Sequence, residues 1–353
     1  MQSLFNYTTA FTLESGVTLP GYHLAYTTHG RLNASKDNVV WIFHALTANS
    51  NPLEWWPGLV GEGKFFDPAK YFIICVNKPG SPYGSLSPLS NKPGTDQPYY
   101  QEFPVFTIND MIRTFRHLKD HLGIHKILVG LGGSTGGMQV LEWAIEEPDL
   151  FEHIVPIATN AAMSPWGIAF NASQRMAIEA DSSWLEPRND AGQKGLATAR
   201  SIALLSYRHY NGYEITQPRD KSFVELTDNV VYAADNYQRY QGLKLVNRFN
   251  AMCYYRLTQS MDSHDVGRNR GGVEKALKSV KAKTLVIGIR SDVLYPIGEQ
   301  EYIQQNIPGA RLLSIASDFG HDGFLLEYEK IEVALKEFIN ERSSNHLKIV
   351  NSA

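Results

Sequence analysis

The chain contains little cysteine and no segment suited to crossing a membrane. Only two of its 353 residues are cysteine. Both lie in apolar segments, so we expect buried free thiols rather than a disulfide framework. No apolar run approaches the about 18 residues that a membrane-spanning helix needs. The first residues lack a basic stretch followed by an apolar one, so we expect no secretory signal and a cytoplasmic protein.

The chain also lacks an excess of either positive or negative charge. The formal net charge is −3, from 33 basic and 36 acidic residues, and no long block of like charge occurs. This balance gives no electrostatic reason to expect nucleic acid or a membrane surface as a partner. At roughly 150 residues per domain, the length fits two domains or one large core with an insertion.

Two patterns that resemble ligand sites do not meet the requirements of those sites. His117, His121 and His125 are spaced by four, but Gly123 interrupts the helix and no acid or cysteine cluster accompanies them. We therefore expect no metal. The segment from Gly58 to Lys64 resembles a phosphate-binding loop, but Phe65 replaces the required Ser or Thr and no strand precedes it.

Several short apolar segments lack an alternating pattern, which is typical of strands buried on both faces of a mostly parallel sheet. Amphipathic helices are predicted over 107–122, ended by Gly123, and over 138–147, before Pro148. Residues 1–30 predict an antiparallel hairpin in which 11–13 is followed by a turn and then 22–26. The predicted buried strands are 39–44, 71–76, 126–130, 153–158, 284–289 and 310–315.

The strand pattern stops near residue 162 and resumes near residue 279. Between them, helical patterns dominate, as over 195–210 and 221–257. We therefore predict one α/β core formed by 1–161 and 279–353, interrupted by a helical lid insertion over 162–278.

The candidate nucleophile is Ser134, in the sequence Gly132-Gly133-Ser134-Thr135-Gly136. A strand is predicted before this G-x-S-x-G motif and a helix after it. In this context the glycines permit a sharp turn that exposes the serine hydroxyl, and the following N–H, of Thr135, contributes to an oxyanion hole. A dinucleotide-binding G-x-G-x-x-G reading fails, because Thr135 occupies the third glycine position. An ordinary glycine turn is the alternative.

A serine nucleophile needs a histidine base, and the histidine needs an acid to orient it. Asp292 follows the predicted strand 284–289, and His321 lies in a loop after the strand 310–315. Both therefore lie at the sheet edge that carries the nucleophile, in the chain order Ser, Asp, His of α/β-hydrolases. A helix-capping aspartate and a surface histidine are the alternatives for each residue taken alone.

With these residues in place, the chain resembles the homoserine O-acetyltransferase family of the α/β-hydrolase superfamily over nearly its whole length. That family has a mostly parallel central sheet flanked by helices, with a helical lid. The motifs that carry the resemblance are His44-Ala45-Leu46-Thr47 and the segments 56–67, 103–111, 132–144, 170–178, 199–208, 240–251, 265–268 and 320–322.

The resemblance implies roles for further residues. Arg200 matches the family's substrate-binding arginine, Asp322 its substrate-binding acid, and Tyr207 is a weaker match from the same pocket. An arginine can hold an amino-acid carboxylate through two hydrogen bonds, and an acid can pair with the ammonium. The backbone N–H of Leu46 is expected to be the second oxyanion donor. Without the resemblance, a surface or packing role would be preferred for Arg200.

The implied reaction is a double displacement with an acyl-Ser134 intermediate. Ser134 takes an acetyl group from acetyl-CoA, a co-substrate rather than a permanently bound cofactor, and homoserine then accepts it, a step of methionine biosynthesis. The family is commonly homodimeric. Departures at Thr135, 48–51 and 77–88 concern the pockets rather than the triad. Succinyl-CoA as donor, serine as acceptor, an esterase or other hydrolase, and a non-catalytic binding protein remain alternatives.

Overall fold

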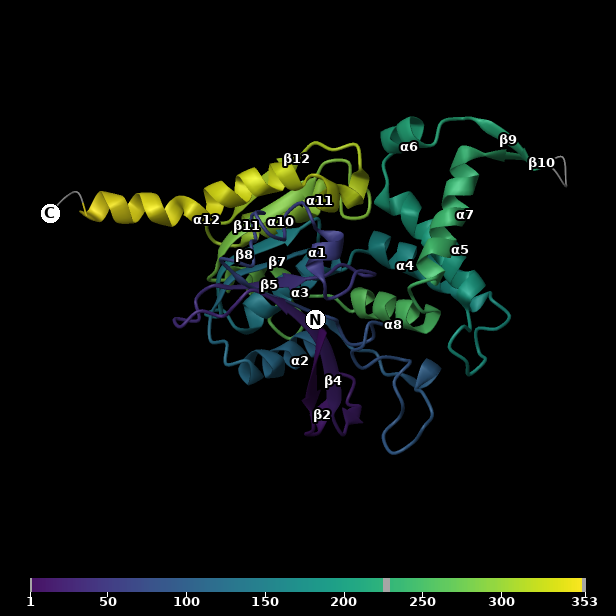
Figure 1. Ribbon diagram of the computed structural model, residues 1–353, viewed down its shortest axis with the longest axis horizontal. Coiled ribbons are helices and arrows are strands. Elements are labelled where there is room, and N and C mark those ends of the chain that lie inside the picture. Colours follow the sequence, from purple (N-terminus) through teal and green to yellow (C-terminus); the bar gives the residue numbers. More distant parts are fainter. Residues whose placement is uncertain (1, 225–228, 351–353) are drawn as a thin grey trace.

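The computed structural model describes residues 2–224 and 229–350 (Figure 1). Its centre is an eight-stranded sheet in the order β1-β4-β6-β5-β7-β8-β11-β12. The strands from β6 to β12 run parallel, and β1 and β4 form an antiparallel edge. The strands are β1 (Gln2–Tyr7), β4 (Tyr22–His29), β5 (Val39–Phe43), β6 (Phe72–Val76), β7 (Ile127–Gly133), β8 (Phe151–Ile157), β11 (Lys283–Ile289) and β12 (Arg311–Ile315). The predicted α/β-hydrolase fold is confirmed.

The continuous apolar character of the central strands follows from burial on both faces. In β5, Val39, Trp41 and Phe43 belong to the hydrophobic core on one face, whereas Val40 and Ile42 belong to the core on the other. All five side chains are buried. Because side chains alternate between the two faces of a strand, a strand covered on both sides needs apolar residues at every position.

Helices supply the two covers. Met111, Met138, Leu277 and Ile303 bring four helices into one core. On the other face, Phe324 and Ile331 bring two helices into the second core, with the short helix α1 (Pro52–Trp55) packed beside them. The four helices are α2 (Ile108–His121), α3 (Thr135–Glu146), α9 (Val273–Lys278) and α10 (Ile297–Asn306), and the two are α11 (Gly323–Leu326) and α12 (Tyr328–Val350). No described helix combines the length and apolarity needed to span a bilayer.

Local sequence explains the limits of α2. The Thr107 hydroxyl accepts a hydrogen bond from the Asp110 N–H at 3.0 Å, and the Asp110 carboxylate accepts one from the Thr107 N–H at 3.2 Å. This reciprocal cap satisfies two backbone donors that a helix start leaves without partners. The predicted helix over 107–122 is confirmed within one residue at each end.

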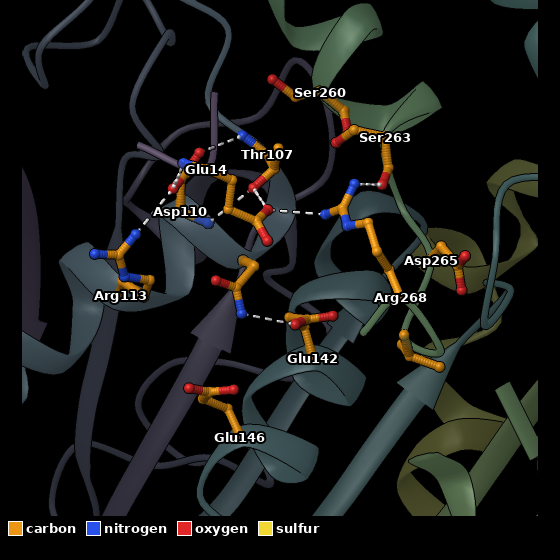
Figure 2. Close-up of polar contacts among 12 residues, drawn as sticks. Glu14, Thr107, Asp110, Arg113, Glu142, Glu146, Ser260, Ser263, Asp265 and Arg268 are labelled. Atoms are coloured by element: carbon orange, nitrogen blue, oxygen red, sulfur yellow. Dashed lines mark hydrogen bonds and ion pairs between the residues drawn. The ribbon is translucent and has the colours of Figure 1, made fainter. Parts of the chain in front are cut away.

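A polar cluster ties α2 to segments far away in the sequence (Figure 2). Glu14 accepts hydrogen bonds from the Thr107 hydroxyl and from Arg268, the latter at 2.8 Å. Asn109 on α2 donates to Glu142 on α3 at 2.9 Å. The cluster joins the N-terminal hairpin, both helices and the loop after α8 (Ala251–Asp262). None of these residues lines the cavity at Ser134, so we assign the cluster a structural role.

Two details of the secondary-structure prediction are wrong. The segment Phe11–Thr12 (β2) pairs with Thr18–Leu19 (β3), whereas β4 pairs with β1, a strand that the sequence analysis did not identify. The predicted helix over 221–257 begins instead with the strands β9 (Lys221–Val224) and β10 (Asn229–Tyr232), and its residues 225–228 lie outside the described part of the chain. Val224, Val230 and Val231 explain this difference, because β-branched residues favour strands over helices.

The remaining helices between β8 and β11 form the helical insertion, which lies to one side of the sheet (Figure 1). Its helix α5 packs against α4 and α7. The proposed division at residues 162 and 278 stays a prediction, and α9, inside that range, packs on α3 and α10. The helices of the insertion are α4 (Pro165–Glu179), α5 (Gln193–Tyr207), α6 (Tyr210–Thr216), α7 (Ala233–Val246) and α8.

We expect Gly136→Ala to destabilise the protein, because a Cβ there would lie 2.2 Å from the Phe43 carbonyl oxygen, a backbone atom that cannot move aside easily. Overpacking of this kind costs about 1–3 kcal/mol. Gly298→Ala is the control: no atom lies within 4 Å of its Cβ position in α10, and the substitution should be neutral or stabilise by up to about 1 kcal/mol. Urea unfolding of both variants checks this, and equal midpoints would contradict it.

Candidate active site

Ser134 lies at the sharp turn between β7 and α3. Its backbone has φ 58° and ψ −125°, an unfavourable conformation for a residue with a side chain. The turn is held from β8 and the residues after it: the Ser134 N–H donates to the Ile157 carbonyl at 2.9 Å, and the Thr159 hydroxyl donates to the Ser134 carbonyl at 2.9 Å. Strain of this kind persists only where surrounding contacts enforce it, and it is typical of a nucleophile elbow.

Asp292 and His321 meet although they lie on separate loops. Asp292 Oδ2 lies 2.6 Å from His321 Nδ1, and both side chains are buried. Asp292 Oδ1 accepts hydrogen bonds from the N–H groups of Leu294 at 2.8 Å and Tyr295 at 3.0 Å. These bonds fix the carboxylate. The carboxylate in turn places the proton of neutral His321 on Nδ1 and leaves Nε2 free to accept a proton.

Ser134 and His321 line the same cavity, which has a volume of about 440 Å³. This is within the usual size of a small-molecule site. Leu46, Arg200, Tyr207 and Asp322 line it as well. The structure therefore brings these predicted site residues to one place, with Asp292 directly behind His321.

The two expected oxyanion donors, the backbone N–H groups of Leu46 and Thr135, come from two different segments of the chain. Leu46 lies in the turn after β5, and its N–H has no hydrogen-bond partner among the described residues. Thr135 is the first residue of α3, so its N–H has no acceptor within the helix. Both N–H groups are therefore available to a ligand.

One helix of the insertion, α5, brings cationic and aromatic groups to the cavity. The Arg200 guanidinium lies over the Tyr207 ring, 5.4 Å from its centroid. The Tyr207 ring lies 5.6 Å from the His321 ring. Arg200 has no ion pair with an acid among the described residues, so it can still bind an anionic group.

Asp322 already has a cationic partner, which the sequence analysis did not assign to the site. Arg208, the residue that caps α5, pairs with Asp322 Oδ2. Arg208 also donates to the Tyr237 hydroxyl at 3.2 and 3.3 Å. The loop that carries His321 packs tightly on Arg208, because a Cβ on Gly320 would lie 2.7 Å from the Arg208 carbonyl carbon. Asp322 thus enters the cavity with one carboxylate oxygen engaged and its other oxygen without a partner among the described residues.

The sequence analysis also missed two basic residues near the turn after β5 that carries Leu46 and Thr47, which we call the oxyanion loop. Arg248, between α7 and α8, donates to the Thr47 carbonyl at 2.5 Å and to the Tyr83 hydroxyl at 2.8 Å. Lys78 is fully buried behind the loop, where its ammonium donates to the His44 carbonyl at 2.8 Å. The motif residues Arg208 and Arg248 were visible in the sequence, but only the fold shows what they contact. Lys78 has no comparable sequence signal.

Comparison with known proteins shows which family and fold the chain belongs to. The family model described as alpha/beta hydrolase fold matches residues 38–328. The chain is 48% identical to the homoserine O-acetyltransferase of Cyclobacterium marinum, over 97% of this chain and 96% of that protein. The alignment therefore spans both the predicted core and the helical insertion.

Two solved structures give the same picture at lower identity. The homoserine O-acetyltransferase of Bacillus anthracis superposes with a TM-score of 0.87 at 26% identity, over 97% of this chain and 98% of that one. An acetylester hydrolase from Corynebacterium glutamicum superposes with a TM-score of 0.83 at 25% identity, over 97% and 96%. A homoserine O-acetyltransferase and an acetylester hydrolase therefore share this fold.

Lys78 gives a stability prediction that depends on pH. Burial lowers the pKa of its ammonium to about 7, whereas an unfolded lysine titrates near about 10.4. Between these pH values the unfolded chain holds a proton that the folded protein has lost, so this site makes stability rise with pH. Lys78→Met removes that gain. Its stability relative to wild type should therefore fall by more than about 1 kcal/mol between pH 7 and 9.5.

Urea unfolding at the two pH values measures this difference. Lys194→Met, at an exposed lysine of α5, is the matched control and should show no such trend. A relative stability of Lys78→Met that stays constant or rises over this range would show that Lys78 remains protonated in the fold.

Proposed function

Because the chain belongs to the homoserine O-acetyltransferase family of the α/β-hydrolase fold, we propose that it transfers an acetyl group from acetyl-CoA to homoserine through an acyl-Ser134 intermediate. One observation carries the proposed chemistry. Ser134, on a strained turn, shares a cavity with His321, whose Nδ1 lies 2.6 Å from the buried Asp292 carboxylate. An imidazole that a carboxylate orients in this way can serve as the base that activates a serine hydroxyl.

In the first half-reaction, His321 Nε2 accepts the proton of Ser134 while the serine oxygen attacks the thioester carbonyl. Negative charge develops on the carbonyl oxygen, where the N–H groups of Leu46 and Thr135 are proposed to stabilise it. The start of α3 adds partial positive charge at the same point. The thiol of CoA then leaves with the proton from His321.

In the second half-reaction, His321 takes the proton of the homoserine hydroxyl, which attacks the acyl-serine ester. The ester bond to Ser134 then breaks, and the serine oxygen leaves with the proton from His321. Arg200 is proposed to bind the homoserine carboxylate, since it has no acid partner of its own among the described residues. The free oxygen of Asp322 is proposed to bind the homoserine ammonium, while Arg208 holds the other oxygen. The acceptor is thus recognised by its two charged groups.

Hydrolysis of an acetyl ester is a second candidate function, favoured by the likeness to the acetylester hydrolase. A hydrolase would need the triad but would not need Arg200 beside Asp322. We therefore prefer the amino-acid acceptor. We also propose that the protein is a cytoplasmic homodimer, and that acetyl-CoA and homoserine are used in preference to succinyl-CoA and serine. The family name supports a role in methionine biosynthesis.

We expect Ser134→Ala to lower kcat for acetyl transfer at least about 1,000-fold, because the acyl-enzyme cannot form. Release of the CoA thiol from acetyl-CoA, with homoserine, serine or water as acceptor, measures this. Ser173→Ala, at an exposed serine of α4, is the control and should match wild type.

Initial velocities of the wild type against both substrates should give parallel reciprocal plots. Intersecting plots would reject the acyl-enzyme scheme.

We expect Arg200→Met to raise the KM for homoserine by about 10- to 100-fold, the loss of a charged hydrogen-bonded contact. The rate of thiol release in the first turnover, before homoserine reacts, should change little. Arg188→Met, which removes an exposed arginine paired with Glu186 and Asp190, is the control. Equal loss in both half-reactions would refute a role in acceptor binding.

A further inference from the structure

We propose that His44, held by Lys78, is a positioning residue for the oxyanion hole: it fixes the peptide unit between Ala45 and Leu46 so that the Leu46 N–H points toward the catalytic cavity. This inference rests on the proposed function, because it assumes that charge develops on an acyl group at Ser134. It gives a task to two buried polar residues that the triad mechanism does not use.

The first step of the argument is the geometry of one peptide unit. The Ala45 carbonyl and the Leu46 N–H belong to the same planar group and, in a trans peptide, point in opposite directions. The described chain contains no cis peptide. His44 Nδ1 lies 2.8 Å from the Ala45 carbonyl oxygen, and His44 is fully buried. Because the carbonyl points toward this buried ring, the Leu46 N–H points away from it.

The second step is the proton on the imidazole. His44 Nε2 accepts a hydrogen bond from the Lys78 N–H at 3.3 Å, and a backbone N–H can only donate. The proton of the neutral ring is therefore on Nδ1, from which it is donated to the Ala45 carbonyl. Burial, aided by the nearby Lys78 charge, keeps the pKa of His44 well below its usual value, so the ring stays neutral. With both nitrogens engaged, His44 is not available as a catalytic base.

The third step is the support for His44 itself. Lys78 contacts it twice: the backbone N–H binds the ring, and the ammonium donates to the His44 carbonyl at 2.8 Å. Lys78 has no ion pair with an acid among the described residues, so the His44 carbonyl is its hydrogen-bond acceptor. A buried amine without an acid partner is costly. The burial of Lys78 at this loop therefore costs stability, which is consistent with a role in positioning His44 for catalysis.

These contacts also affect the strength of the donor. A hydrogen bond to the carbonyl of a peptide polarises that unit and makes its N–H a better donor. His44 therefore both orients the Leu46 N–H and strengthens it. Preorganised donors of this kind avoid reorganisation during the reaction, which is the source of their catalytic effect.

The test compares two substitutions that keep different nitrogen positions of the ring. An asparagine amide can place its nitrogen near the Nδ1 position, whereas a glutamine amide reaches the Nε2 position. We expect His44→Gln to lower kcat by about 10- to 100-fold, a part of the about 100- to 1,000-fold loss for a whole oxyanion donor. His44→Asn should recover most of that loss. The KM should change little in either variant.

The substrates are p-nitrophenyl acetate, with water as acceptor, and acetyl-CoA with homoserine. An inhibitor, 1,1,1-trifluorobutan-2-one, forms an oxyanion adduct with an active serine. Its inhibition constant should rise in His44→Gln by the factor by which kcat falls. Thermal unfolding of each variant separates this effect from loss of fold. Lys78→Met tests the support of His44 separately, because it removes the hydrogen bond from the Lys78 side chain to the His44 carbonyl. This variant should also lower kcat, with unchanged KM.

Equal losses in His44→Asn and His44→Gln, or a destabilised His44→Gln with wild-type kcat and inhibition constant, would overturn the inference. Failure of the proposed function is recognised separately. A wild type that hydrolyses p-nitrophenyl acetate through Ser134 but does not acetylate homoserine would reject the transferase, while the comparison of the His44 variants would still decide the role of His44.

Discussion

The turn at Ser134 is the constraint on which the site depends. Its backbone conformation is unfavourable for a serine and is held by β8 through the Ile157 carbonyl and by Thr159. The same turn requires the start of α3 to pack directly against the end of β5, at a distance that only glycine permits at position 136. One bend therefore sets the position of the serine oxygen, the first N–H of α3 and the strand end that leads to Leu46.

The sheet determines where the partners of Ser134 can lie. Parallel strands bring their carboxyl ends to one edge, so loops after β7, β11 and β12 meet there although His321 lies 187 positions after Ser134 in the chain. The helical insertion completes the site from the other side. Its helix α5 carries Arg200 and Tyr207 to the cavity. Arg208, which caps α5, pairs with Asp322 and so joins the insertion to the loop that carries His321.

The oxyanion loop is supported from two directions. Arg248 holds the Thr47 carbonyl from the insertion, and Lys78 with His44 holds the loop from the buried side. The Arg248 guanidinium donates the first hydrogen bond, and the buried Lys78 amine donates the second, to the His44 carbonyl. The loop is therefore held by these hydrogen bonds as well as by the packing of Leu46 in the hydrophobic core.

The sequence by itself determined the fold class, the buried strands and the chain order of Ser134, Asp292 and His321, because these follow from local patterns and from the rule that parallel strands share an edge. It misjudged residues 221–224 and 229–232, where short strands lie inside a helical region and the local pattern is ambiguous. Only the tertiary structure decided that Asp322 is paired with Arg208 and that His44 and Lys78 lie behind Leu46. Such contacts join residues far apart in the chain, and no local periodicity encodes which of the many arginines and lysines will meet a given carbonyl or carboxylate.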